Sequence, residues 1–412
     1  MTEFTRDYKF ENTISADLVF PGLLERLSTQ RADRVTKIVE RFFSKTLKAT
    51  ATGAPFVITG DIPAMWLRDS TWQVSAFLKS PNKEIGEILA DISISQQRFF
   101  LIDPYANAFN PEPNGFCWHK DFPDQSPWVF ERKYELDSLA SVLYLARKIR
   151  ENWGIERHLL DEFQTVVETM VALAQREQRH DPQSYFFHRN NGVDHDSLPG
   201  DGFGNPVEYT GMIYSAFRPS DDACVYGYLI PANYFFLNEL KQLPQTTEIS
   251  TLVRDISQGI QNFGTVDGKL AYEVDGLGNY LLIDDANTPS LLSLSYLGVI
   301  EHDNPIYVKT REFVLSESNP YFFSGLIASG IGSQHTPKNH IWPIAIAMEA
   351  LSKSNVAELD QYLLLLESTD NGTSFMHESF HMDDPSIFTR DWFSWADATY
   401  LELVVKSVEY GY

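Results

Sequence analysis

The chain has 412 residues, of which 43% are hydrophobic and 22% charged, so it has enough apolar material for a large core and too little charge for a disordered chain. Its formal net charge of −23 argues against nucleic acid as a partner, because that binding depends on Lys and Arg, and it disfavours an anionic membrane surface for the same reason. No apolar run is long enough to span a membrane, and the N-terminal residues lack the basic and apolar regions of a secretion signal.

Apolar residues recur at helical spacing from one end of the chain to the other. The pattern predicts a short helix near 19–28 and a strongly amphipathic one at 34–47. Further helices are predicted at 66–79, 82–103, 134–152, 155–179, 222–242, 246–264, 287–299, 304–315, 339–353, 355–368 and 391–408. Loops rich in Gly, Pro, Asn and Asp separate them at 104–132, 180–221, 266–287 and 370–390, and a small hairpin is expected from 269–272 and 279–282.

The order of these elements indicates an all-α fold. No strand-then-helix alternation and no low-complexity linker is visible, so residues 1–412 are expected to form a single catalytic domain. About a dozen helices joined by alternately short and long loops suggest helical hairpins in a ring. The sequence therefore predicts an α/α barrel with its long loops, carrying small β-hairpins, gathered at one end.

The first cluster of candidate site residues lies where the predicted helix at 66–79 begins. Arg68 and Asp69 stand beside Trp66 and Trp72. A carboxylate can accept hydrogen bonds from neighbouring sugar hydroxyls while an indole face packs on the ring, so this group is typical of a sugar site. The alternative is a structural ion pair at a helix start.

The second cluster is Asp221 and Asp222, which precede an apolar run. Two acids in the first turn of a helix are electrostatically favourable, which is a purely structural explanation. Adjacent carboxyl groups can also raise one another's pKa enough for one to act as a general acid at neutral pH. The sequence leaves both explanations open.

The third cluster contains His377, Glu378 and His381, with Trp395 downstream. Glycoside hydrolysis needs two carboxyl groups, and Glu378 would supply the second, remote in sequence from the first. Three further polar and aromatic patches are candidates to line the same cavity: His119 with Lys120, Tyr134 with Glu135, and His340 with Trp342.

The same segment also matches the H-E-x-x-H pattern of zinc peptidases, in which two His one helical turn apart hold the metal and the Glu activates water. A zinc peptidase using His377, Glu378 and His381 is therefore an alternative. Two observations disfavour it: Asp384 and Ile387 stand where the extended motif has Gly and the third His, and turn-forming residues flank the segment, leaving little room for a helix.

The cysteine and aromatic residues bear on the cellular compartment and on the type of site. Cys117 and Cys224 form no disulfide framework, which suits a reducing compartment, so a cytoplasmic location is expected. The 28 Phe, 19 Tyr and 8 Trp residues fit either sugar stacking or the packing of a large core.

Taken together, Asp61–Ser70, Arg218–Asp222 and Met376–Phe380 resemble the corresponding motifs of glycoside hydrolase family 125, the bacterial and fungal exo-α-1,6-mannosidases. The resemblance covers nearly the whole chain. It implies an (α/α)6 barrel of six helical hairpins and a hydrolase without metal or cofactor. The implied reaction releases mannose, with inversion, from the non-reducing end of α-1,6-linked manno-oligosaccharides of the N-glycan type.

When the roles of the family's residues are transferred motif by motif, the resemblance implies that Asp221 or Asp222 is the general acid and that Glu378 is the general base. Inversion requires their carboxyl groups to stand about 6.5–9.5 Å apart. The residues expected to bind the sugar are Arg68, Asp69 and Arg218, with Trp66, Trp342 and Trp395 as walls and His119, Lys120, Glu135 and His377 as further contacts. Another α/α-barrel carbohydrate enzyme, such as a lyase or epimerase, or a catalytically silent glycan binder remains an alternative.

Overall fold

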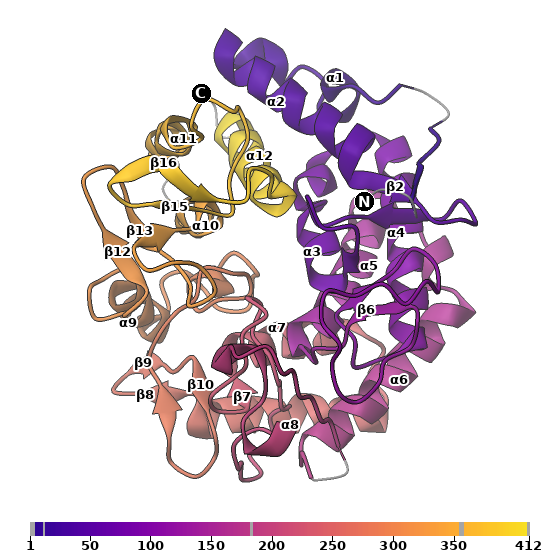
Figure 1. Ribbon diagram of the computed structural model, residues 1–412, viewed down its shortest axis with the longest axis vertical. Coiled ribbons are helices and arrows are strands. Elements are labelled where there is room, and N and C mark those ends of the chain that lie inside the picture. Colours follow the sequence, from indigo (N-terminus) through magenta and orange to yellow (C-terminus); the bar gives the residue numbers. More distant parts are fainter. Residues whose placement is uncertain (1–4, 11–12, 182–183, 354–357, 410–412) are drawn as a thin grey trace.

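Helices of the chain alternate between the outer and the inner ring of a barrel, shown in Figure 1. The structure is a computed structural model that describes residues 5–10, 13–181, 184–353 and 358–409. The outer ring contains α2 (Thr29–Arg41), α4 (Lys83–Ile102), α6 (Asp161–Glu177), α8 (Thr247–Phe263), α9 (Pro305–Val314) and α11 (Leu359–Ser368). The inner ring contains α3 (Leu67–Trp72) with the 3-10 turn η3 (Ser75–Lys79), α5 (Leu136–Trp153), α7 (Ile230–Gln242), the 3-10 turn η7 (Leu292–Leu294), α10 (Pro343–Leu351) and α12 (Ser394–Glu409).

Neighbouring inner elements contact one another in chain order, and α12 closes the ring on α3. Figure 1 shows the same closure, with yellow α12 next to the indigo segments of the N-terminal part. Each outer element is followed along the chain by an inner element, which makes six hairpins. The predicted (α/α)6 barrel is confirmed.

Burial distinguishes the two rings. Outer α8 buries Ile249, Leu252, Ile256 and Ile260, a single stripe at helical spacing, and leaves its other side to solvent. Inner α10 buries nearly every residue, as expected of a helix packed on all sides. The amphipathic pattern of the outer helices is what made them visible in the sequence.

Aromatic side chains fill the centre of the barrel. The Trp72 ring lies 5.2 Å from that of Tyr144, 5.8 Å from that of Phe235 and 6.3 Å from that of Tyr296, so four inner segments meet there. These residues are core residues, and a large share of the aromatic content therefore serves packing.

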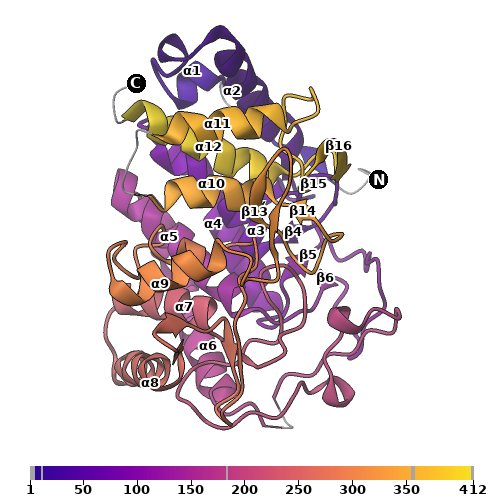
Figure 2. The ribbon, with the colours of Figure 1, turned by 90° about the vertical axis from the view of Figure 1, so that its left-hand side faces the viewer.

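Short strands gather at the end of the barrel where the inner helices begin (Figure 2). β4 (Met65–Trp66) leads into α3, β7 (Tyr228–Leu229) into α7 and β14 (His340–Ile341) into α10. Two three-stranded antiparallel sheets lie beside the site: β4 with β5 (Ala108–Phe109) and β6 (Val129–Glu131), and β14 with β15 (Ser379–His381) and β16 (Asp384–Thr389). The other described α-helix is α1 (Ala16–Val19), and the other described strands are β1 (Arg6–Asp7), β2 (Leu47–Ala49), β3 (Pro55–Val57), β8 (Thr265–Val266), β9 (Lys269–Leu270), β10 (Glu273–Val274), β11 (Tyr280–Leu281), β12 (Phe322–Ser324) and β13 (Ser329–Ile331).

Some predicted elements differ from the structure. The helix expected at 222–242 begins only at Ile230, that at 339–353 begins at Pro343 after β14, and that at 287–299 is reduced to η7. The predicted hairpin exists, but β11 pairs with β10 instead of with 269–270. The helix at 355–368 begins at Leu359, and residues 354–357 lie outside the described part of the chain. None of the described helices combines the length and the hydropathy of a membrane span.

Candidate active site

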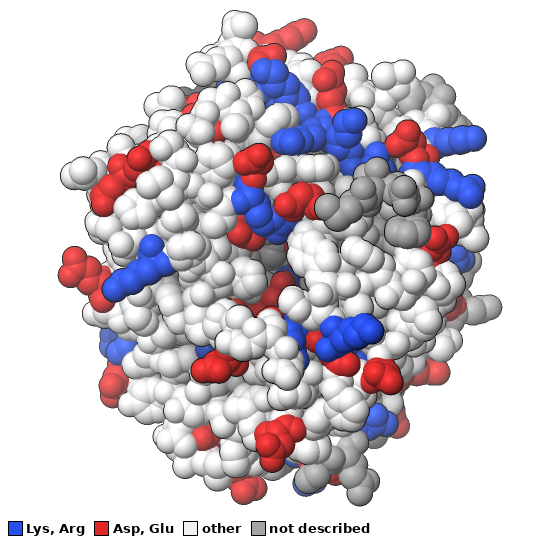
Figure 3. Space-filling view, viewed as in Figure 1, with Lys and Arg blue, Asp and Glu red and all other residues white. Residues whose placement is uncertain are grey.

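A cavity of about 320 Å³ opens where the inner helices begin. Figure 3 shows this face, hollowed near its centre with acidic side chains inside the hollow. The cavity brings together the three sequence clusters, which lie far apart along the chain. The predicted site residues that line it are Trp66, Arg68, Asp69, His119, Asp221, Asp222, Trp342, Glu378 and Trp395.

Arg68, in the first turn of α3, is the buried centre of an acidic cluster. Its guanidinium lies within 3.4 Å of the carboxylates of Glu135, Asp69, Asp137 and Asp221. Burial raises the pKa of Asp69 to about 6, although the charge of Arg68 opposes the rise. One cation thus holds together a group of acids that would otherwise repel one another.

Asp221 lies at the tip of a tight turn, closed by the pairing of Phe217 with Ala223. Its backbone adopts the left-handed region, with φ of +67°. A quarter of its side chain is exposed. The carboxylate contacts Arg68 Nη2 at 3.3 Å and Asn107 Nδ2 at 3.4 Å. Asp221 therefore presents a carboxyl group to the cavity from a fixed turn.

Asp222, the next residue, is held differently. Only 2% of its side chain is exposed, and one carboxylate oxygen lies 2.8 Å from His195 Nδ1 and 3.4 Å from His335 Nδ1. Burial opposes ionisation of Asp222, but the hydrogen bonds and charges of the two histidines outweigh it and hold its pKa well below the usual range. In return Asp222 raises the pKa of His335 to about 9 against the effect of burial. Asp222 is thus an ionised partner of two imidazoles.

Glu378, just before β15, also lines the cavity. Arg390 Nη1 lies 3.3 Å from its carboxylate, and Asp397, in the first turn of α12, accepts a hydrogen bond of 2.8 Å from the amide of Met376. The segment that carries Glu378 is therefore held by the side chain of Arg390, which follows β16, and by that of Asp397 in α12. The cavity thus combines carboxyl groups from two remote segments with arginines, histidines and indoles, the chemistry of a carbohydrate-cleaving site.

Comparison with known proteins identifies the family. The profile of the metal-independent alpha-mannosidases, family GH125, matches residues 32–405. The chain belongs to this family.

The chain is similar to individual proteins to different degrees. A GH125 structure from Streptococcus pneumoniae, described as a non-productive substrate complex with alpha-1,6-mannobiose, is 37% identical, with a TM-score of 0.90 over 96% of this chain and 100% of that one. The meiotically up-regulated gene 157 protein of Schizosaccharomyces pombe is 38% identical over 391 residues, 86% of this chain and 76% of the relative. A bacterial glucoamylase complexed with acarbose is 12% identical, with a TM-score of 0.56 over 94% of this chain and 57% of that one, and shares the fold alone.

Four predicted sugar contacts of this GH125 member do not line the cavity that holds Asp221 and Glu378. Lys120 lines a separate cavity together with Cys117. Glu135 is buried behind Arg68. Arg218 is buried against Glu273 at 2.6 Å, and His377 is buried with its ring stacked on Phe388 at 3.8 Å between centroids. Glu135 and Arg218 face other protein charges, and none of the four lines the cavity that holds Asp221 and Glu378, so the structure does not support direct sugar contact by these four residues there.

The zinc hypothesis fails on geometry. It requires His377 and His381 on one face of a helix, whereas Ser379–His381 is strand β15. The His377 ring stacks on Phe388, and the His381 ring packs edge-on against that of His340. Within the described residues no group of three or more His, Cys, Asp or Glu side chains is arranged to hold a metal ion. The two histidines cannot share a metal from these positions.

Several cavity residues were not predicted from the sequence: Lys133, Arg189, His195, Asn287, His335 and Arg390. Arg390 had a usable signal, because Arg390, Asp391 and Trp392 repeat the arginine, carboxylate and indole combination of the first cluster. The sequence around His335 and Lys133 carries no such signal, because distant loops supply the neighbours of these two residues.

Proposed function

We propose that this GH125 enzyme is an inverting exo-α-1,6-mannosidase that releases mannose from the non-reducing end of N-glycan-type manno-oligosaccharides. The observation that carries the proposal is the meeting of Asp221 and Glu378 in one cavity, from segments more than 150 residues apart. The α-1,6 linkage is supported by the mannobiose complex of the pneumococcal relative. A cytoplasmic location belongs to the proposal and is supported by Cys117 and Cys224, which are both free.

Asp221 is the better general acid of the two neighbouring aspartates. A general acid must lie within hydrogen-bond reach of the leaving oxygen and must carry a proton. A quarter of the Asp221 side chain is exposed, while Asp222 is almost fully covered and is kept ionised by two histidines. Asp222 therefore serves to orient and charge His335 and His195.

The proton required for the reaction is held by a pair of carboxyl groups. Burial and nearby negative charge raise the pKa of Glu135 well above its usual range, whereas Arg68 and Lys133 overcome the effect of burial and lower the pKa of Asp221. The negative charge of Asp221 contributes to the raised pKa of Glu135, so Glu135 is the one of the two carboxyl groups that holds a proton. Glu135 thus stores the proton in the free enzyme, and Asp221, which faces the cavity, delivers it.

Glu378 completes the reaction as the general base. It takes a proton from a water molecule whose oxygen attacks the anomeric carbon, while the bond from that carbon to the glycosidic oxygen breaks and Asp221 protonates the departing oxygen. One water is consumed, and the products are β-mannose and the shortened acceptor. Arg390 holds the Glu378 carboxylate in place for this step.

Product analysis on defined oligosaccharides tests the proposal. Linear α-1,6-mannotriose labelled at its reducing end should yield mannose and labelled mannobiose first, and α-1,6-mannobiose should be cleaved faster than its α-1,2 and α-1,3 isomers. Glu378→Gln should lose nearly all turnover, whereas Glu151→Gln, on the exposed side of α5, should retain it. Labelled mannose as the first labelled product, or equal cleavage of all linkages, would contradict the proposal.

A further inference from the structure

Lys133 is a buried cation in the wall of the active-site cavity. It follows β6, and only 2% of its side chain is exposed. Its ammonium group donates a hydrogen bond of 2.7 Å to the main-chain carbonyl oxygen of Asp221 and a second one to the carboxylate of Asp196. Lys133 thus contacts the backbone of the proposed general acid.

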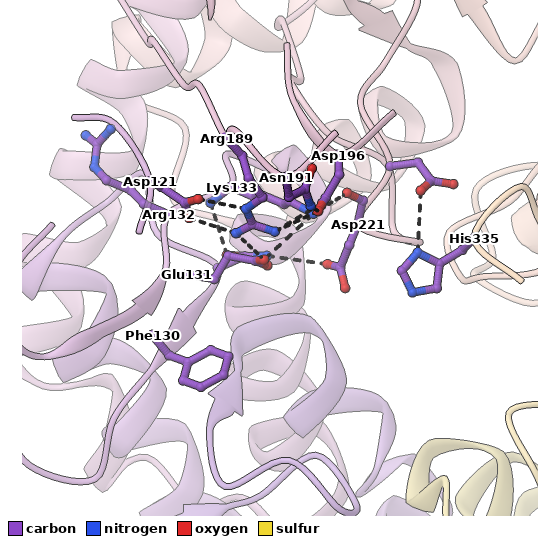
Figure 4. A network of polar contacts seen from close by, with 12 residues as sticks. Asp121, Phe130, Glu131, Arg132, Lys133, Arg189, Asn191, Asp196, Asp221 and His335 are labelled. Carbon is purple, nitrogen blue, oxygen red and sulfur yellow. Dashed lines mark hydrogen bonds and ion pairs between the residues drawn. The ribbon is translucent and has the colours of Figure 1, made fainter. Parts of the chain in front are cut away.

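A network of buried charges fixes the position of Lys133 (Figure 4). Arg189 binds both carboxylate oxygens of Asp121 at 2.7 Å, contacts Glu131 at 2.9 Å and lies 3.1 Å from both oxygens of Asp196. Glu131, in turn, lies 3.7 Å from Lys133 Nζ. The network joins β6 to two long loops, so the ammonium group has little freedom to move.

The backbone of Asp221 needs such support. Its φ of +67° lies in the left-handed region, which residues with side chains rarely adopt. The amide of Asp221 is held by the carbonyl of Arg218 at 2.9 Å, and Lys133 holds its carbonyl. With both peptide groups fixed, the side chain is directed towards Arg68 and the cavity.

We propose that Lys133 is a positioning residue for proton donation: by binding the Asp221 carbonyl it keeps the Asp221 carboxyl group aligned with the leaving oxygen. This inference rests on the proposed function of Asp221 as the general acid. It assigns to Lys133 an effect on leaving-group departure and none on recognition of the terminal mannose.

Leaving-group dependence tests the inference. An aryl mannoside with a strongly acidic phenol departs without a proton, whereas the oligosaccharide needs one. Lys133→Met should therefore lower kcat on α-1,6-mannobiose by roughly 10- to 100-fold. Its KM should stay within about threefold, and 2,4-dinitrophenyl α-mannoside should be cleaved at nearly the wild-type rate. Lys37→Met, at an exposed surface pair with Asp33, is the matched control and should behave as wild type on both substrates.

Asp221→Asn measured in parallel separates the two claims. Suppose that Asp221→Asn loses only the activity on the oligosaccharide, while folded Lys133→Met loses both activities equally or neither of them. Lys133 then does not position the acid. The inference about Lys133 is overturned, and the proposed function stands. If Asp221→Asn itself loses both activities equally, Asp221 is not the general acid, and both claims fail. A selective loss in both variants supports both.

Discussion

The guanidinium of Arg390 lies 3.3 Å from the carboxylate of Glu378 and is itself held by Asp61 and by the carbonyl oxygen of Thr59 at 2.9 Å. Arg390 follows β16, while Asp61 belongs to the loop before β4, so this contact joins the two ends of the barrel ring at the cavity. A carboxylate that must face a water molecule is thus oriented by a cation anchored on a different segment.

Arg390→Met is expected to lower kcat on α-1,6-mannobiose by roughly 10- to 100-fold, because the base loses its fixed orientation. Steady-state kinetics check this. Arg157→Met also removes an arginine bound to two carboxylates, Glu87 and Asp91, but on the surface, and should leave kcat unchanged. Wild-type kcat in Arg390→Met would show that Glu378 is oriented by other groups.

Asp222→Asn should lower the pKa of His335 from about 9 towards its ordinary value of 6.5. Burial alone lowers the pKa of His335, and the hydrogen bond and charge of Asp222 are the largest effects that raise it. An NMR titration of the His335 ring measures the change. Asp221→Asn should shift this pKa less, since Asp221 contributes a weaker charge effect. A titration midpoint that stays near 9 in Asp222→Asn would disprove the proposed pairing.

Substrate binding should weaken as the pH falls through about 6. Burial raises the pKa of Asp69 to about 6, so the carboxylate that its sequence motif predicts to accept sugar hydroxyls becomes protonated below that pH. KM for α-1,6-mannobiose should rise between pH 7 and pH 5 in the wild type. In Asp69→Asn it should be high and flat across the same range. A KM that is independent of pH in the wild type would argue against this role.

Stability should also depend on pH through Asp284, which is buried and accepts hydrogen bonds from the amides of Leu291 and Leu292 at 2.8 and 3.0 Å. Burial raises its pKa from 3.8 to about 8. The stability linked to the raised pKa of Asp284 is fully present below about pH 4 and is lost as the pH rises through 8. Over this range the free energy of unfolding falls by up to about 1.4 kcal/mol per pH unit.

Thermal unfolding of Asp284→Asn between pH 5 and pH 8 checks this linkage. The asparagine cannot ionise, so the difference in Tm between the wild type and the variant should shrink as the pH rises. Parallel curves of Tm against pH for the wild type and the variant would mean that the pKa of Asp284 is not raised by folding.

The fold was largely predictable because amphipathic periodicity marks most of the barrel helices. The prediction of helices was wrong where side chains distant in sequence bind backbone amides. The amides of Val225 and Tyr226 donate to Glu273, about 50 residues away, and this keeps 222–229 out of the helix that its apolar sequence suggests. Asp284 captures the amides of Leu291 and Leu292 in the same way, so the helix expected at 287–299 is only a short turn.

The candidate site was predictable in its catalytic clusters and less so in its supporting residues. Arg68, Asp221 and Glu378 stand in motifs that suggest their chemistry, and the structure brings them into one cavity. The position of Lys133 depends on Asp196 and on the Asp221 carbonyl, partners that only the folded loops supply. Arg218 and His377 stand in equally suggestive motifs, yet packing turns them towards Glu273 and Phe388.

The most direct test of the proposed function is the anomeric configuration of the first product. Proton NMR of the wild-type enzyme acting on α-1,6-mannobiose, recorded before mutarotation equilibrates the anomers, should show β-mannose appearing first, as a water activated by Glu378 requires. α-Mannose as the first product, or no mannose at all, would contradict the account.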